Sequence, residues 1–101
     1  EDLNPFLGVH AAVTRRSLDG APGPEGWYPQ QRLTVTEALY AYTVGAAYAG
    51  GVEDRLGSLA PGKLADLIIL DRDVFACAEE ELPQTRVIAT MIGGQFVYGH
   101  P

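Results

Sequence analysis

One stretch of the sequence decides the fold: Leu56-Gly-Ser-Leu-Ala-Pro-Gly-Lys-Leu-Ala-Asp-Leu-Ile-Ile-Leu-Asp71. Pro61 and Gly62 suit the two central positions of a type II turn, because proline presets a negative φ and glycine accepts a positive one. This turn is expected to fold residues 57–60 back against the segment that follows. Residues 67–70 are apolar on both alternate faces, which predicts a central strand covered on both sides.

The C-terminal residues predict the rest of a small sheet. Residues 86–92 are almost continuously apolar, and the pair Gly93-Gly94 suits the two-residue hairpin turns that require a positive φ. Residues 95–98 then return as the partner strand. If Ser58 starts a further strand over residues 57–60, the sheet has about four strands, most of them antiparallel.

A first helix is predicted near the N-terminus. Asn4 is a good N-cap residue, and Pro5 suits the first helical position because its missing N–H group would have no partner there. Apolar residues at helical spacing extend the helix from Pro5 to about Ser17, and Gly20 is expected to end it.

A loop rich in proline and glycine follows, over residues 21–26. It ends in Trp27 and Tyr28, which carry large apolar surfaces. Trp27 either anchors the loop by burying its ring or marks a loop, residues 20–31, that borders a ligand site.

A capping box marks the second helix. Thr34 and Glu37 each satisfy a backbone N–H group at its start, and Gly50-Gly51 end it. Apolar residues occupy all its faces, which is typical of a helix that is buried all round. Because 101 residues offer too little material to cover such a helix, we expect it to pack against the rest of a longer chain or against further copies of this one.

Together these elements predict an α+β fold, in which two helices precede a small, mostly antiparallel sheet. We expect a helical segment over residues 1–52 and the sheet over residues 53–101. Hydrophobic residues make up 47% of the chain and charged residues 20%, a composition typical of globular proteins. No apolar run reaches the length of a membrane span, and the scattered basic residues, with a net charge of −6, do not favour nucleic acid as a partner.

The residues that could carry chemistry form no recognisable site. His10 and His100 lack the spacing of a metal-binding pair, and His10 fits a partly buried helix face. The single cysteine, Cys77, has no nucleophile signature and is expected to be an inert thiol. It excludes an internal disulfide and favours a reducing, cytoplasmic compartment, although a periplasmic or secreted protein fits as well.

Two further candidates are interpreted as structural. Ser58 lacks the second glycine of a nucleophile elbow. Asp66 is expected to pin the turns near Gly57 and Gly62 by accepting hydrogen bonds from their N–H groups. The acidic residues 73–81 are expected to be irregular, with Glu79-Glu80-Glu81 in a solvated turn. We therefore predict no catalytic, cofactor-binding or metal-binding residue in this chain.

Four segments, taken in order, resemble metal-dependent amidohydrolases. The run Gly57-Ser-Leu-Ala-Pro-Gly-Lys-Leu-Ala-Asp66 and the hairpin over residues 87–98 resemble the C-terminal end of these enzymes. The upstream segments are Asn4-Pro-Phe-Leu-Gly-Val-His-Ala-Ala-Val-Thr-Arg15, Trp27-x-Pro-x-Gln31-Arg-Leu-Thr and Thr36-Glu-Ala-Leu-x-Ala-Tyr-Thr43. They are similar to amidohydrolase family 3, the branch that includes N-substituted formamide deformylases.

The resemblance implies a larger enzyme, with a TIM-type barrel that carries the metal site and a small β-sandwich composite domain. Residues 1–52 would then lead out of the barrel, and residues 53–101 would form the C-terminal share of the sandwich. The parent would use one or two metal ions, usually zinc, to hydrolyse non-peptide carbon–nitrogen bonds. The family's metal-binding aspartate would precede Glu1, and Asp2 does not match it.

On this interpretation the isolated chain is inactive and holds no cofactor, because the metal ligands lie elsewhere. Its partners are the rest of the amidohydrolase chain or, when isolated, other copies of itself. The alternative is a free-standing structural module that uses the sheet and the apolar helix for self-association.

Overall fold

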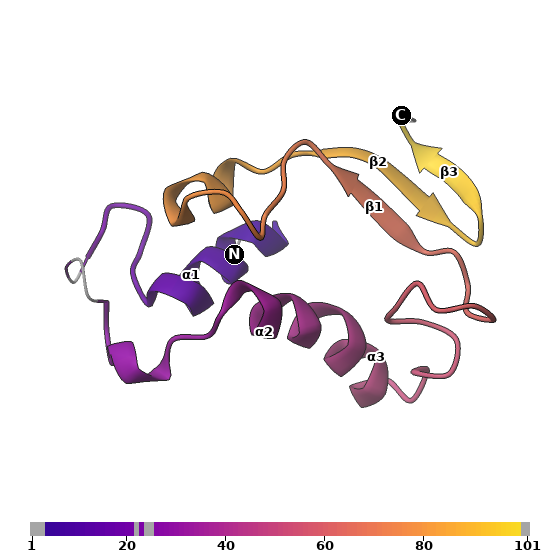
Figure 1. Cartoon of the computed structure of the whole chain (residues 1–101), viewed down its shortest axis with the longest axis horizontal. Helices are drawn as coiled ribbons and strands as arrows, with labels where there is room; N and C mark the ends of the chain where they lie inside the picture. Colours follow the sequence, from indigo (N-terminus) through magenta and orange to yellow (C-terminus); the bar gives the residue numbers. More distant parts are fainter. Residues whose placement is uncertain (1–3, 22, 24–25, 100–101) are drawn as a thin grey trace. The chain divides into compact units, whose positions relative to one another are not determined.

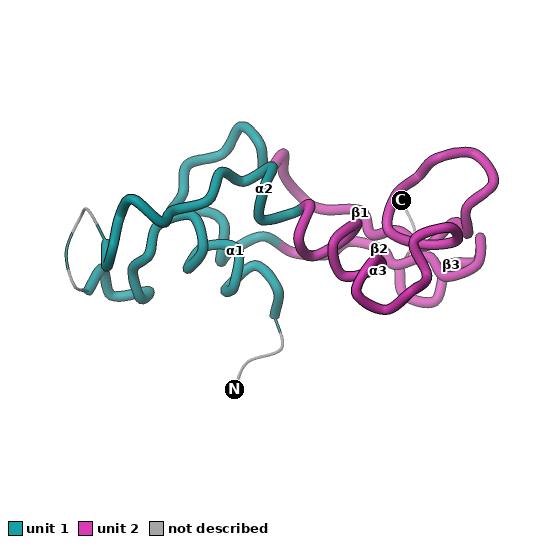
Figure 2. The backbone as a smooth tube through the Cα atoms, turned by 90° about the horizontal axis from the view of Figure 1, so that it is seen from below, with its two compact units in different colours: residues 1–39, 74–85 teal, residues 40–73, 86–101 magenta. Residues whose placement is uncertain are grey.

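The computed structural model describes residues 4–21, 23 and 26–99. The chain divides into two compact units, coloured separately in Figure 2. Unit 1 contains residues 1–39 and 74–85, and unit 2 contains residues 40–73 and 86–101. Helices and a small antiparallel sheet confirm the predicted α+β class (Figure 1). The expected boundary between residues 52 and 53 stays a prediction.

In unit 1, helix α1 spans Pro5–Thr14 and begins as predicted. The Asn4 side chain accepts a hydrogen bond of 3.0 Å from the backbone N–H of Phe6. The predicted end at Ser17 is wrong, because Arg15 already adopts a left-handed conformation with φ of 57° and donates its N–H to the Ala11 carbonyl oxygen. Helix α1 therefore ends before Gly20 can act as its cap.

The segment 79–84 corrects a second expectation. It forms a 3-10 helix, η3 (Glu79–Gln84), which packs beside α1 (Figure 1), whereas the sequence predicts an irregular segment to residue 81. The Ala78 N–H donates to the Glu81 carboxylate at 3.0 Å, and Leu82 is fully buried. The three glutamates are exposed, as predicted. The core of unit 1 is apolar, and both of its chain segments, residues 1–39 and 74–85, contribute to it. Its members are Phe6, Val9, Val13, Ala38, Val74 and Leu82.

The second helical run begins with the predicted capping box. Thr34 N–H donates to the Glu37 carboxylate at 2.9 Å, and Glu37 N–H donates to the Thr34 hydroxyl at 3.0 Å. The run comprises α2 (Val35–Tyr40), a π-helical turn η2 (Ala41–Gly45) and α3 (Ala46–Ala49), so the π turn is a feature that the apolar pattern does not predict.

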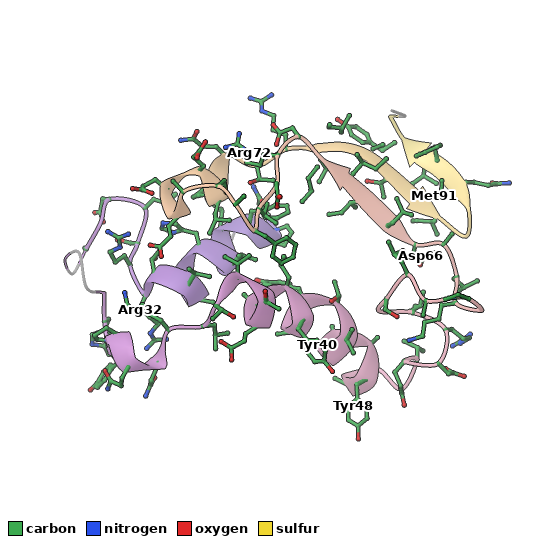
Figure 3. The ribbon with its side chains drawn as sticks, in the orientation of Figure 1. Arg32, Tyr40, Tyr48, Asp66, Arg72 and Met91 are labelled. Atoms are coloured by element: carbon green, nitrogen blue, oxygen red, sulfur yellow. The ribbon has the colours of Figure 1, made fainter. Side chains whose placement is uncertain are left out.

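Burial on every face of this run is not observed within the described residues. Its buried residues are Ala38 and Ala47, both small. Tyr40 and Tyr42 are exposed, and Tyr48, at 73% exposure, points away from the helix (Figure 3). The described chain places no element over these tyrosines.

In unit 2, three strands form an antiparallel sheet in the order β1-β2-β3 (Figure 1). They are β1 (Leu67–Leu70), β2 (Val87–Ile92) and β3 (Gln95–Tyr98). Gly93 and Gly94 have φ of 58° and 84°, which confirms the predicted primed hairpin turn. Because β1 lies at the sheet edge with Ile68 46% exposed, the prediction of a central, doubly covered strand is wrong for this chain.

The predicted turn at Pro61-Gly62 is confirmed, but the strand before it is not. Gly62 has φ of 90°, and Lys63 N–H donates to the Ala60 carbonyl oxygen at 3.2 Å. Residues 57–60, including Ser58, form no strand, so the described sheet has three strands rather than about four. The reason is that Gly57 packs against the helical run at Ala47 instead of pairing with β1. No helix among the described residues is long and apolar enough to cross a membrane.

Candidate functional site

Asp66 is structural, as predicted, but it holds a different turn. It lies at the start of β1 (Figure 3), and its carboxylate accepts a hydrogen bond of 2.8 Å from Gly93 N–H. Gly94 N–H donates to the neighbouring Ala65 carbonyl oxygen at 3.0 Å. Asp66 therefore fixes the β2–β3 turn, and the predicted contacts with the turns at Gly57 and Gly62 are not the ones observed.

Unit 2 contains a groove of about 530 Å³ between the helical run, residues 56–59 and the start of β1. Its lining is mostly apolar, with Thr43, Ser58 and Asp66 as its polar members. No hydrogen bond joins Ser58 to Asp66 among the described residues, and no histidine lines the groove. This groove offers apolar surface but no nucleophile paired with a base.

A second concavity, here called the α1 pocket, lies in unit 1 and measures about 480 Å³. It is lined by residues from α1, the segment after it and η3: His10, Arg16, Ser17, Leu18, Asp19, Gly20, Glu80, Pro83 and Gln84. It combines an imidazole, a guanidinium and two carboxylates.

Burial, an ion pair and hydrogen bonds position several polar side chains of the α1 pocket. His10 is on the buried face of α1 as expected, with 7% exposure. Arg16 Nη2 lies 3.6 Å from the Glu79 carboxylate. Asp19 accepts hydrogen bonds from the Ser17 hydroxyl and, at 3.0 Å, from Ala21 N–H. These two bonds, the hydroxyl first, lower the pKa of Asp19 below its ordinary value, so its carboxylate is ionised at neutral pH.

The loop after α1 is closed by Arg15 and Trp27. Trp27 N–H donates to the Arg15 carbonyl oxygen at 2.8 Å, and Arg15 Nε donates to the Trp27 carbonyl oxygen at 2.8 Å. The guanidinium lies 5.6 Å from the centre of the indole ring. Since Trp27 is 62% exposed, anchoring by a buried ring is wrong, and the two hydrogen bonds between Arg15 and Trp27 anchor the loop instead. That the loop borders a ligand site stays a hypothesis.

The remaining sequence candidates do not meet in a site. Cys77 is a half-buried free thiol whose sulfur lies 3.9 Å from the Val74 carbonyl oxygen. His100 falls outside the described residues. In the described part of the chain, no group of three or more His, Cys, Asp or Glu side chains could hold a metal ion. No set of side chains among the described residues therefore fits a zinc centre.

Sequence reasoning missed the α1 pocket. The sequence places Arg16 only as a residue near the end of the predicted first helix, and Asp19 belongs to no motif. The signal that joins them to Glu80 is tertiary, because η3 lies some sixty residues further along the chain. No local pattern marks that packing.

Comparison with known proteins places the sequence in a family. The sequence profile described as the amidohydrolase family matches residues 1–98. An N-substituted formamide deformylase of Arthrobacter pascens is 39% identical over 86% of this chain and 15% of its own length. The putative amidohydrolase YtcJ of Bacillus subtilis is 36% identical over 97% of this chain and 18% of its own length.

A plant protein, LONG AFTER FAR-RED 3 of Arabidopsis thaliana, is 36% identical over 96% of this chain and 16% of its own length. No solved structure matches the chain. The chain thus spans between 15% and 18% of the length of these three relatives. Since the family profile covers nearly every residue, the chain belongs to the amidohydrolase family.

Proposed function

We propose that this chain is the C-terminal region of a metal-dependent amidohydrolase that hydrolyses non-peptide carbon–nitrogen bonds. The observation that carries the proposal is the family match over residues 1–98, together with relatives of which the chain spans less than a fifth. One of those relatives is named for the deformylation of N-substituted formamides, which is the hydrolysis of such a bond.

The proposed role of this chain within the parent is to support a catalytic centre that other residues form. Residues 1–52 would lead out of a TIM-type barrel, and residues 53–101 would contribute to a β-sandwich completed by the other end of the parent chain. In this proposal the metal ions, zinc being the usual choice in the family, are held by barrel residues, and the isolated chain has no hydrolase activity.

The exposed face of the sheet supports this role. Ile68 pairs with Thr90, and Ile88 and Ile92 lie two residues to either side of Thr90 on the same strand. Alternate residues of a regular strand share a face, so Ile68 and Ile92 lie on one face of the sheet. Ile88 lies where the β1–β2 register shifts, and all three isoleucines are exposed. An apolar sheet face of this kind is normally covered by a second layer.

The direct test compares two proteins. One is the 101-residue chain, and the other is the longer product of the reading frame extended upstream of Glu1. Hydrolysis of an N-substituted formamide is followed with and without added zinc. We expect turnover by the extended protein with zinc and none by the 101-residue chain. Turnover by the shorter chain at an ordinary enzymatic rate, or stoichiometric zinc bound to its side chains, would defeat the proposal.

One observation favours a second function, a free-standing module for self-association. Tyr40, Tyr42 and Tyr48 expose aromatic surface along one helical run, and aromatic residues are enriched at protein interfaces. A reading frame that starts at this domain, with no barrel sequence upstream, would favour the module over the enzyme fragment.

A further inference from the structure

The α1 pocket contains a buried donor atom that has no hydrogen-bond partner within the described residues, Arg16 Nε. His10 is more than nine-tenths buried and lines the same pocket. A buried polar group without a partner costs about 1–3 kcal/mol, so folded proteins pair such groups with protein, water or ligand.

The geometry leaves Arg16 able to accept a new partner. Its ion pair with Glu79 is 3.6 Å long, which exceeds a hydrogen bond, and 21% of its side chain is exposed. A small rotation of the guanidinium therefore presents its unpaired N–H edge to the pocket. A guanidinium offers only donors, so the group that satisfies it must supply an acceptor oxygen.

The charges around the pocket indicate which kind of acceptor group fits it. Arg16 contributes one positive charge, while Asp19 and Glu80 contribute two carboxylates. Glu79 faces the same guanidinium from outside the lining. A free anion would enter a pocket whose carboxylates outnumber its guanidinium, and a simple cation would leave the arginine donor unpaired. A neutral amide avoids both penalties, because it carries a carbonyl acceptor and an N–H donor on one planar group.

We propose that the α1 pocket binds a neutral amide group, without breaking any bond in it. The carbonyl oxygen accepts a hydrogen bond from the Arg16 guanidinium, and the amide N–H donates to a ring nitrogen of His10. The volume of about 480 Å³ is within the range of small-molecule sites. The amide belongs either to a small molecule or to a polypeptide segment outside this unit. This assignment is independent of the hydrolase function proposed above, since it involves no metal and no reaction.

The test is an NMR titration of the full chain that observes the Arg16 Nε–H and His10 ring signals. N-methylacetamide is the neutral amide probe. Acetate serves as an anion of similar size and methylammonium as a cation. We expect N-methylacetamide to shift both signals saturably, and acetate to shift them at least tenfold less at equal concentration. No saturable shift, or stronger binding of acetate, would overturn the assignment.

Two variants sharpen the test, and a third serves as a control. Arg16→Lys keeps the charge but removes the planar donor edge, so we expect amide affinity to fall about tenfold. Glu80→Gln removes a negative charge from the pocket lining, so acetate binding should strengthen. Arg55→Lys, at an exposed arginine outside the pocket, should alter neither. Equal amide affinity in Arg16→Lys and the unchanged chain would contradict the proposed contact.

The source of the amide is decided with a capped peptide, acetyl-Gly-Gly-N-methylamide. Binding at least tenfold tighter than that of N-methylacetamide supports a polypeptide segment as the natural occupant. Equal binding supports a small-molecule amide. A peptide that binds without shifting the Arg16 and His10 signals would place its site elsewhere and overturn the proposal.

Discussion

Gly57 directs the loop between the helical run and the sheet. It has φ of +103°, and a Cβ atom added there would lie 2.9 Å from the Cβ of Ala47 and 3.2 Å from the Cα of Val44. The close approach lets this segment pack on the helix, which explains why it does not continue as a strand. Two separate features therefore favour glycine at position 57: the positive φ and the lack of room for a Cβ atom.

Substituting Gly57 tests that coincidence. We expect Gly57→Ala to lower the free energy of unfolding by about 2–4 kcal/mol, because it adds steric overlap to the penalty of a left-handed backbone. Gly62→Ala is the matched control, since Gly62 has φ of +90° but no atom within 4 Å of the added Cβ. Urea denaturation measures both variants, and an equal loss in the two would show that packing at Gly57 contributes nothing.

Asp66 permits a second test at this scale. Removing its carboxylate in Asp66→Ala should leave Gly93 N–H without its 2.8 Å partner and destabilise the chain by about 1 kcal/mol. Hydrogen exchange at the Gly93 amide should accelerate, because its N–H then lacks the carboxylate acceptor. Asp54→Ala, at another exposed aspartate, should leave that amide unchanged. Unaltered exchange in Asp66→Ala would count against the pinning role.

At the scale of elements, the capping box controls how the second helical run responds to acid. The backbone N–H of Thr34, followed by its hydroxyl, lowers the pKa of Glu37 below its ordinary value. A carboxyl whose pKa is lower in the folded state stabilises fully above its unfolded pKa, about 4.3 for glutamate. That stabilisation is lost as the pH falls through the lower, folded pKa.

The expected result is a loss of helical signal by circular dichroism as the pH falls below about 4, in addition to any general acid effect. Glu37→Gln should show a shallower decrease over the same range, since its amide does not titrate. Thr34→Ala should lower the free energy of unfolding by about 1 kcal/mol at neutral pH, as the loss of an N-cap does. Identical acid profiles for Glu37→Gln and the unchanged chain would refute the capping contribution.

In unit 2, a second carboxylate, Asp71, also stabilises the folded chain less as the pH falls. Asp71 has a lowered pKa, first because Arg86 N–H donates to its carboxylate at 3.0 Å and second because of Arg72. This bond joins the segment after β1 to the start of β2, so its loss below the folded pKa loosens the sheet rather than the helix. The Glu37→Gln variant separates the two contributions, since it leaves Asp71 intact.

At the scale of the whole molecule, the exposed apolar surface predicts self-association of the isolated chain. Tyr48, Ile68, Ile88 and Ile92 are all exposed, and contiguous apolar surface is typical of interfaces. We expect light scattering to give the mass of a dimer or larger, and Ile88→Glu or Tyr48→Glu to shift it toward the monomer.

The control for this prediction is Arg55→Glu, which changes the charge of an exposed polar position without touching the apolar surface. A compact monomer at all concentrations, with no binding of a dye that reports apolar surface, would contradict the prediction. Since the expected partner in the parent is the rest of the chain, the extended protein should not self-associate through these residues.

The sequence by itself determined the features whose causes lie within a few residues. Asn4 caps α1, Thr34 and Glu37 cap the second helical run, and the pairs Pro61-Gly62 and Gly93-Gly94 form the expected turns. Each depends on a preferred φ or on a hydrogen bond between near neighbours, which residue type alone specifies. The family could also be identified, because its motifs are continuous segments of the chain.

Only the tertiary structure decided the contacts between distant residues. Asp66 finds its partner 27 residues away, Gly57 packs on the helix rather than on β1, and η3 brings Glu80 to the pocket that His10 and Arg16 line. The physical reason is that these contacts depend on which elements pack together. A turn residue or an apolar run shows that an element forms, but the partner of a side chain is set by the space left when the elements meet.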